Sequence, residues 1–357
     1  MTKIERYIFL EVLKPLAAVL GILVGLFACF SSARYLAEAI TETLGLALML
    51  KLVFLKTVIA LEVLVPVALY VSIIIGLGRM HRDQEIIAMR AAGIRGTRII
   101  RAILWVAIPV GLIVGLLSVI GRPLAYADSY LLDARANAEL NTDRFQAGRF
   151  YGNEDSGRVV YINKKNESSG QMSEIFHYID KHDAKEIIVS TRATQQAAQD
   201  GLRNELHLFD GTIHRLMYGE EKDEVITFEK LVLYIDNAEE DIGYKRKAAA
   251  TVDLIHSEEA NDVAELQWRL SRPLATLLLA LIAVPLSKSS PRQGRNEKIF
   301  TAAMIFALYY NISGLARTWV EQGVVGSFPG IWWLQVVLVV LVAIMLLPEF
   351  RTGRRVP

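Results

Sequence analysis

The hydrophobic residues of this chain are concentrated in six long runs, three in each part of the sequence that flanks a polar block. A helix needs about 20 mostly apolar residues to cross the hydrocarbon of a membrane, and each run approaches that length. The pattern therefore predicts six membrane-spanning helices, of which the fourth is the weakest because Arg272 and Pro273 lie near its start. The predicted spans cover residues 16–33, 57–77, 102–120, 270–287, 299–316 and 331–347.

The polar block between the third and fourth runs has the alternation of apolar and polar residues that is typical of half-buried strands. Asp210-Gly211 indicates a hairpin turn between two strands, and a slip in the apolar phase around Lys230 indicates a β-bulge. No convincing helical pattern interrupts the strands, so an antiparallel sandwich, jelly roll or barrel is expected. The expected strands are residues 158–164, 174–179, 185–191, 204–209, 212–218 and 224–235, with a polar turn at 219–223.

The alternation also suggests which side chains face the interior of the β block. A two-layer roll that is open along one edge could hold acyl chains inside it. Val160, Ile162, Ile188 and Leu208 are the candidate lining residues. The opposite phase, represented by Val159 and Tyr161, remains an alternative.

Basic residues are distributed unequally between the two sides of the predicted spans. Loop 79–101 contains six arginines, whereas the short loops on the other side contain few basic residues. Because cytoplasmic loops are enriched in Lys and Arg, both termini are expected in the cytoplasm and the β block outside it. The first run lacks an obvious cleavage site, so we expect it to be a retained span and not a removed signal peptide.

Composition narrows the classes of function. Of the 357 residues 53% are hydrophobic, which is unusual for a soluble protein, and the net charge of +1 gives no reason to expect nucleic-acid binding. A single cysteine, Cys29, rules out a disulfide framework within one chain. The histidines of the β block lack metal-ligand spacing, and the sequence has no GxxxxGK[ST] phosphate loop. We therefore expect no metal site, no catalytic residue and no bound cofactor.

The loop between the second and third spans reads as a short helix with its own start and stop. Asp83 can cap the N-terminus, and Glu85 adds negative charge to the first turn. Gly93 fits a left-handed C-terminal stop, with Arg90 in the last turn. Such a helix suggests a segment that is presented to a partner. The alternative is a basic cytoplasmic loop with an incidental helical turn.

Charged residues in or beside the spans are candidates for a site that binds a phosphorylated amphiphile. Glu62 lies within the second span, where an ionisable side chain is costly. A structural ion pair with Lys56 or with a basic group of another span explains it equally well. Arginines at the outer ends of the spans could bind phosphate bidentately, although snorkelling to head groups accounts for any one of them. The candidate substrate-binding residues are Arg34, Arg122, Arg272, Arg317 and Glu62.

Several short motifs carry a resemblance to a known family. They are Ile-Glu-Arg-Tyr at residues 4–7, Arg-Tyr-Leu-Ala-Glu-Ala at 34–39, Leu-Gly-Arg-Met at 77–80 with Asp-Gln-Glu at 83–85, Arg-Ala-Ala-Gly at 90–93, Glu-Leu-Gln-Trp-Arg-Leu-Ser at 265–271, and Val-Pro-Leu-Ser at 284–287 with Pro-Arg-Gln-Gly-Arg at 291–295. Together with the order of spans and β block, they resemble the LptF/LptG permeases of the lipopolysaccharide export system, and the F type most. The resemblance covers nearly the whole chain.

The resemblance implies an α+β membrane protein with six transmembrane helices, three plus three, and an inserted periplasmic antiparallel β jelly-roll domain. The domains would be residues 1–127 with a cytoplasmic coupling helix at 82–93, the jelly roll at 128–262, and the last three helices at 263–357. Glu85 matches the family's coupling-helix glutamate, which docks in an ATPase, and Asp83 and Arg90 flank it. Arg34 matches a basic position that faces the substrate cavity.

The implied protein is a half-permease of an inner-membrane ABC transporter, which extracts lipopolysaccharide and passes it to a periplasmic bridge toward the outer membrane. Its implied partners are an LptG-like second permease, an LptB-like ATPase dimer that uses the ATP, and an LptC-like membrane-anchored periplasmic protein. The alternative is a membrane-anchored periplasmic scaffold without a transport step, for which six spans and a capped inner helix are more than anchoring requires.

Overall fold

The computed structural model describes residues 2–41, 46–138, 147–153, 158–166, 171–180, 184–197, 203–217, 223–236, 244–288 and 295–351. The chain divides into two compact units. The helical unit comprises Met1–Ala33, Lys51–Ser129 and Tyr244–Pro357, and the sheet unit comprises Arg34–Leu50 and Tyr130–Gly243. Residues 219–222 of the predicted polar turn and residues 291–294 of the last motif lie outside the described residues.

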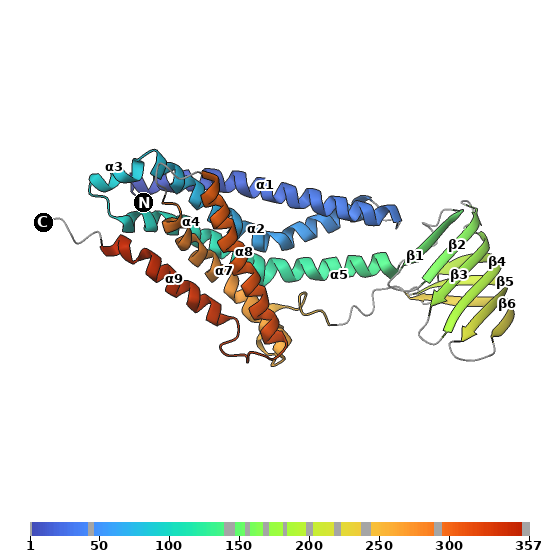
Figure 1. Ribbon diagram of the computed structural model, residues 1–357. Coiled ribbons are helices and arrows are strands. Elements are labelled where there is room, and N and C mark those ends of the chain that lie inside the picture. Colours follow the sequence, from blue (N-terminus) through green and yellow to red (C-terminus); the bar gives the residue numbers. More distant parts are fainter. Residues whose placement is uncertain are drawn as a thin grey trace. The chain divides into compact units, whose positions relative to one another are not determined.

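Long helices dominate the described chain (Figure 1). Among the described residues, four segments are long and apolar enough to cross a membrane, and the third of them is continuous from Gly96 to Asp133. A shorter apolar helix covers Trp332–Leu347. The helices are α1 (Lys3–Thr41), α2 (Leu46–Arg82), α3 (Glu85–Ala91), α4 (Gly96–Leu116), the π-helical turn η1 (Leu117–Gly121), α5 (Arg122–Ala138), α6 (Thr251–Ile255), α7 (Ala260–Leu286), α8 (Arg295–Glu321) and α9 (Trp332–Arg351).

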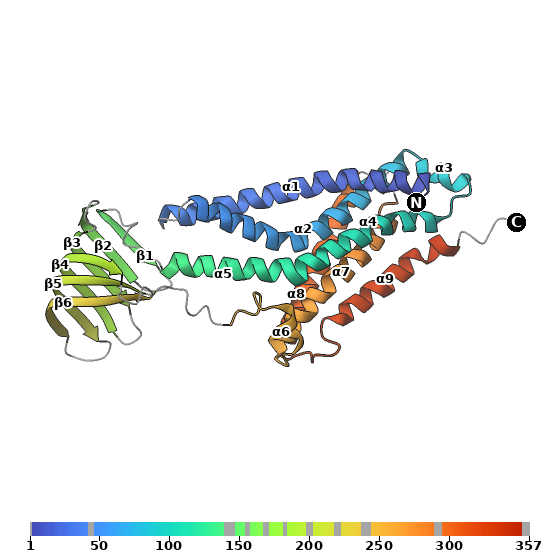
Figure 2. The ribbon, with the colours of Figure 1, turned by 180° about the vertical axis from the view of Figure 1, so that it is seen from behind.

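Helix α7 is at the centre of the helical unit and packs against α4, α8 and α9 (Figures 1 and 2). Small residues allow the close approach of α4. A Cβ atom at Gly111 would lie 3.4 Å from the side chain of Leu277, and one at Gly115 would lie 3.5 Å from Pro273. Both distances are ordinary or tight van der Waals contacts, so a larger side chain at Gly111 would push the two helices apart.

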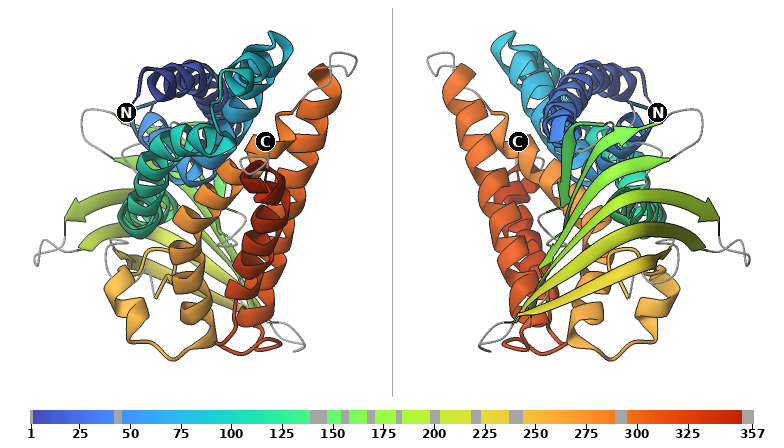
Figure 3. Two further views of the ribbon diagram at one scale, coloured as in Figure 1. Left: turned by 90° about the vertical axis from the view of Figure 1, so that its left-hand side faces the viewer. Right: turned by 90° about the vertical axis from the view of Figure 1, so that its right-hand side faces the viewer.

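The sheet unit contains one antiparallel sheet in the order β1-β2-β3-β4-β5-β6, so each strand pairs with its neighbours in sequence (Figure 3). The expectation of a jelly roll is therefore wrong for the described strands. A jelly roll needs two sheets and crossing connections, whereas these strands are joined as successive hairpins. The strands are β1 (Arg149–Asn153), β2 (Arg158–Lys165), β3 (Met172–Asp180), β4 (Ala184–Ala197), β5 (Arg203–Met217) and β6 (Glu224–Asp236).

The hairpin predicted at Asp210-Gly211 is also wrong, because β5 continues through it. Asp210 has a φ of 52°, in the left-handed region that Asp adopts more readily than most residues. The strand can pass through position 211 because glycine has no Cβ atom; a Cβ atom there would collide with the ring of Phe228. A turn-forming dipeptide is used here to redirect the side chains of a strand.

The slip in apolar phase near Lys230 is real, but it is not a bulge of β6 against β5. The pairing of these strands keeps one register on both sides of the slip, from Leu208 with Leu231 to Ile213 with Ile226. Every strand from β3 to β6 changes phase at the same transverse row, so no extra residue is needed. The row consists of Glu174, Thr191, Asp210 and Glu229. The buried positions on the two sides of the row are Met172 and Ile175 in β3, Ile188 and Ala193 in β4, and Leu208 and partly buried Ile213 in β5, and all of them belong to one core cluster.

Candidate functional site

Helix α3 lies at the same end of the helical unit as the start of α1 (Figures 1 and 2). Its N-cap residue is Gln84, which has a φ of 59° and makes no side-chain cap hydrogen bond. The predicted cap by Asp83 is therefore wrong, because α2 extends to Arg82 and Asp83 pairs instead with Arg79 at 3.5 Å. Gly93 has a φ of 82°, so the predicted glycine stop is confirmed.

The carboxylate of Glu85 is held by two neighbouring helices. The Tyr7 hydroxyl of α1 donates a hydrogen bond to Glu85 Oε2 at 2.8 Å. Arg79 Nη2 of α2 lies 3.9 Å from Glu85 Oε1, and Arg79 Nη1 lies 3.3 Å from Glu11. Since Asp83 also pairs with Arg79, one guanidinium is shared among three carboxylates.

The two faces of α3 differ in exposure. Ile86 is 2% exposed and belongs to the core of the helical unit, whereas Ile87 is 60% exposed. Arg90 lies on the exposed surface of the last turn. The helix is therefore anchored by Ile86, with the partly buried Met89 packed against the same core, and presents a mixed apolar and charged surface, which is typical of docking surfaces in proteins.

A second group of charged residues is buried in the helical unit around Glu265 of α7, whose side chain is 0% exposed. Arg122 Nη1 lies 2.8 Å from Glu265 Oε1, and Arg317 Nη2 of α8 lies 2.8 Å from Oε2. Arg269, one turn further along α7, places its Nε 3.0 Å from Oε1. Three guanidiniums therefore share one carboxylate, which satisfies its oxygens and offsets part of the cost of burying the charges.

Glu62 of α2 joins the same network. Its Oε2 lies 3.2 Å from Arg122 Nε, and Ser118 Oγ of the π-helical turn η1 donates to its Oε1 at 2.8 Å. The structure thus pairs Glu62 with Arg122, a basic group of another span, as one of the anticipated ion pairs required. The π-helical turn places Ser118 and Arg122 so that both contact the carboxylate of Glu62. Such turns occur often at functional sites.

Arg269 also fastens the segment that enters α7. Its Nη1 donates to the backbone oxygen of Ala249 at 3.0 Å and to Thr251 Oγ1 at 2.8 Å. Thr251 Oγ1 in turn donates to the backbone oxygen of Val119 at 2.7 Å. A fully buried arginine thus connects α7 and η1 with residues 244–259, the segment that precedes α7 and is called the connector below.

Arg272 and Arg317 flank the indole of Trp268. The Arg272 guanidinium lies 3.5 Å from the ring centroid, and that of Arg317 lies 5.2 Å from it. Arg272 is buried and donates to Ser313 Oγ at 2.9 Å, while Arg317 also pairs with Glu321 at 2.8 Å. Cation–π contact and hydrogen bonding compensate the charge of Arg272, which has no carboxylate within 4.0 Å among the described residues.

The connector carries two groups with shifted pKa values. Burial lowers the pKa of Lys247, and the positive charges of Arg317 and Arg122 lower it further. Burial raises the pKa of Tyr244 to about 12, and its hydrogen bond to Asp262 adds to the shift. The environment of Lys247 is thus rich in positive charge, as the predicted cluster of arginines implied.

The structure therefore brings together Glu62, Arg122 and Arg317 and places Arg272 beside them, but it holds them in ion pairs and aromatic contacts. Arg34 is exposed near the end of α1 and belongs to the sheet unit. The role of all five in substrate binding stays a prediction.

The residues predicted to line an apolar interior lie on one face of the sheet. Val160, Ile162, Ile188 and Leu208 are all buried within one cluster. Val159 and Tyr161 of the opposite phase are only partly buried. The predicted phase is confirmed, whereas contact with a lipid stays a prediction.

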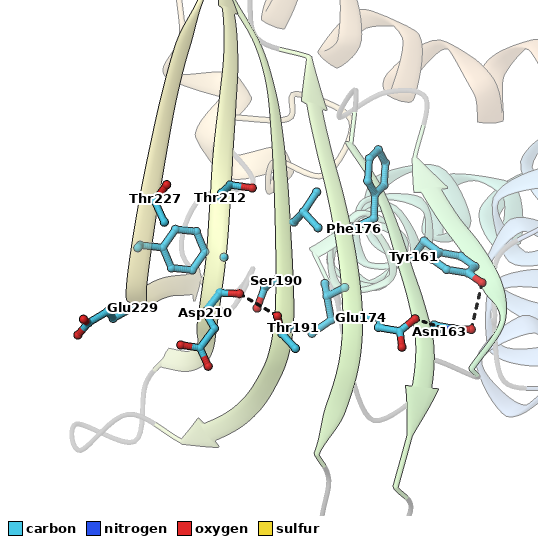
Figure 4. Close-up of a pocket in the computed structure, with 14 residues that line it drawn as sticks. Tyr161, Asn163, Glu174, Phe176, Ser190, Thr191, Asp210, Thr212, Thr227 and Glu229 are labelled. Atoms are coloured by element: carbon cyan, nitrogen blue, oxygen red, sulfur yellow. Dashed lines mark hydrogen bonds between the residues drawn. The ribbon is translucent and has the colours of Figure 1, made fainter.

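The transverse row at which the strands change phase lines an open hollow of about 970 Å³ (Figure 4). Asn163 Nδ2 donates to Glu174 Oε2 at 2.6 Å, and Thr191 Oγ1 donates to the backbone oxygen of Asp210 at 3.0 Å. Glu229 adds a third carboxylate to the lining. Like charges repel, so this hollow is a poor match for a phosphate group. Within the described part of the chain, no group of His, Cys, Asp and Glu could hold a metal ion.

Sequence reasoning did not assign several residues of these sites, among them Glu265, Tyr7 and Ser118. Glu265 was noted only as part of a motif, although its spacing of four residues from Arg269 was a visible signal for an ion pair on one helix face. Tyr7 was also noted only as part of a motif, and nothing near it in the sequence pointed to its contact with Glu85, because the two residues are far apart in the chain.

Comparison with known proteins decides the family. The family model described as "Lipopolysaccharide export system permease LptF/LptG" matches residues 6–348. The chain belongs to the LptF/LptG family. It is 23% identical over 363 residues to the lipopolysaccharide export system permease protein LptF of Escherichia coli (strain K12), an alignment that covers 99% of this chain and 96% of that protein. The protein of the same description from Shigella flexneri gives the same values.

Membership in the LptF/LptG family confirms the resemblance carried by the sequence motifs. As a family member, the chain is a multi-pass membrane protein and a permease subunit, and it is not an enzyme. The long apolar helices and the inserted antiparallel sheet agree with this.

Proposed function

We propose that this LptF/LptG family member is one half of an inner-membrane ABC transporter that extracts lipopolysaccharide and passes it to a periplasmic bridge toward the outer membrane. The observation that carries the proposal is α3, a short helix between two long apolar helices that is anchored by Ile86 and presents Glu85. A permease that does not hydrolyse ATP needs such a contact with the protein that does.

The proposed partners are an LptG-like second permease, an LptB-like ATPase dimer and an LptC-like membrane-anchored periplasmic protein. Glu85, with Asp83 and Arg90 beside it, would dock in the ATPase, which supplies the ATP-driven step. Asp83 and Glu85 are the two carboxylates of an otherwise basic loop, so they are the groups of this segment that would pair with a basic groove.

The proposed topology has six spans, with α8 and α9 as the last two, both termini in the cytoplasm and the sheet unit in the periplasm. The domains would be residues 1–127, 128–262 and 263–357. The arginines of loop 79–101 support the orientation, because positive charge is retained on the cytoplasmic side.

Cysteine labelling tests this topology. In a Cys29→Ala background, Thr191→Cys should react with an impermeant maleimide in intact spheroplasts, and Ala92→Cys should react only after permeabilisation. Both positions are exposed, so accessibility within the protein does not limit either reaction. Labelling of both from outside would contradict the orientation.

For the substrate, we propose that the apolar face of the sheet receives acyl chains and that the exposed Arg34 meets a phosphate group as the lipid enters. Four other residues would act less directly, by fixing the helices around the entry path, because they are buried or partly buried and not exposed. They are Glu62, Arg122, Arg272 and Arg317.

Photo-crosslinking tests the lipid path. A photoreactive residue at Ile188, on the apolar face, should form an ATP-dependent adduct with lipopolysaccharide in membranes that contain the assembled transporter. The same residue at Val189 is the matched control, since it is the next position and lies on the opposite face, 43% exposed. Adducts at Val189 alone would reverse the proposed face, and adducts at neither position would favour a scaffold without a transport step.

A further inference from the structure

The short helix α3 depends on other helices for the orientation of its first residue. It has seven residues and no side-chain cap at Gln84, and Ile86 is its only buried residue among those described. A helix this short has little stability of its own. The direction of the Glu85 side chain is therefore set by the groups that bind its carboxylate.

Of the two groups that bind Glu85, Tyr7 makes the shorter contact. Its hydroxyl lies 2.8 Å from Oε2, whereas Arg79 Nη2 lies 3.9 Å from Oε1. The side chain of Arg79 is 48% exposed and is divided among Glu11, Asp83 and Glu85, so its attraction for any one of them is weak and screened. A hydrogen bond to a charged acceptor at the Tyr7 distance is stronger.

The start of α1 is a firm support for Tyr7. Ile8 and Val12 are 0% exposed and belong to the core of the helical unit. A Cβ atom at Gly76 of α2 would lie 2.7 Å from the backbone oxygen of Glu11, so the backbones of α1 and α2 are in direct contact there. The Tyr7 hydroxyl is thus carried by a segment that cannot shift independently of α2.

We propose that Tyr7 is a positioning residue for ATPase coupling: its hydroxyl orients the Glu85 carboxylate for docking and ties α3 to α1. The docking of Glu85 in an ATPase rests on the proposed function, whereas the contact between Tyr7 and Glu85 does not depend on it. It makes α1 a direct mechanical partner of the coupling helix, in addition to α2 and α4, which are joined to α3 by the chain.

The contact is tested without a partner by hydrogen exchange in the full-length protein. Tyr7→Phe removes only the hydroxyl and should speed exchange of the amides of residues 85–91 by about tenfold. Amides of α4 should not change. Tyr161→Phe is the matched control, because its hydroxyl contacts Asn163 at 3.4 Å in the sheet unit. Unchanged exchange in α3 would overturn the inference.

The coupling role is tested by a double-mutant cycle with the ATPase that co-purifies with the wild-type chain. Tyr7→Phe should weaken its binding about five- to tenfold when Glu85 is present, and less than about twofold in a Glu85→Ala background. Equal losses in both backgrounds would mean that Tyr7 acts only through packing, and would overturn the inference while the proposed function stands. Unchanged binding in Glu85→Ala alone would refute the proposed docking, whatever the exchange data.

Discussion

Replacing Glu265 with alanine is expected to destabilise the helical unit by about 3–5 kcal/mol, because it leaves buried guanidiniums without their shared carboxylate. Arg122 and Arg269 are 4% and 0% exposed, so water cannot replace the lost partner. The loss should appear as a lower unfolding temperature of the detergent-solubilised protein and as a smaller monodisperse fraction.

The matched control is Glu321→Ala, which removes a carboxylate that also pairs with Arg317 but whose side chain is 19% exposed. Water can reach that site, so a loss of about 1 kcal/mol or less is expected. Equal unfolding temperatures for the two variants would contradict the structural role of the network. A Glu265→Ala protein that folds normally but binds lipopolysaccharide poorly would instead favour direct contact between this cluster and the substrate.

The parts of the fold that depend on local pattern could be predicted from the sequence. The long apolar helices follow from composition and length, and the buried phase of β2 follows from the alternation through Val160 and Ile162. The hairpin at Asp210-Gly211 failed because the same dipeptide suits any place that needs a positive φ, including a strand interior. The cap at Asp83 failed because the preceding helix runs further than its apolar run suggested.

The candidate sites depend on contacts that have no local signature. Glu62 can be recognised in the sequence as a charged residue in an apolar run, but nothing near it in the sequence identifies Arg122 as its partner. The apolar phase slip at Lys230 was visible, yet its meaning required the neighbouring strands, because all of them slip together and the register is unchanged. Pairing between distant residues is set by the packing of whole helices and strands, which cannot be read from the local pattern of residues along the chain.

Glu85→Lys is expected to abolish both assembly with the ATPase and lipopolysaccharide transport, while the chain still inserts and folds. The side chain of Glu85 is partly exposed and, unlike that of Ile86, is not buried in the hydrophobic core. Replacing it therefore costs the folded protein little stability. At a docked interface, removing one member of a charge pair costs about 2–5 kcal/mol of binding free energy, much of it from the charge left unpaired. Lysine adds repulsion against a basic groove and places a second cation beside Arg79, which lies 3.9 Å from the native carboxylate.

The series Glu85→Gln, Glu85→Ala and Glu85→Lys separates docking from helix propensity. Docking predicts progressively weaker assembly in that order, since glutamine keeps the hydrogen bond from Tyr7 and lysine reverses the charge. Helix propensity predicts that alanine and lysine are both tolerated, because both are good helix formers. The measurement is ATPase co-purification together with ATP-dependent lipid release, with Glu258→Lys as a charge-reversal control at an exposed position elsewhere in the helical unit. Normal assembly and transport in all three Glu85 variants would leave α3 as an ordinary turn in a basic membrane loop.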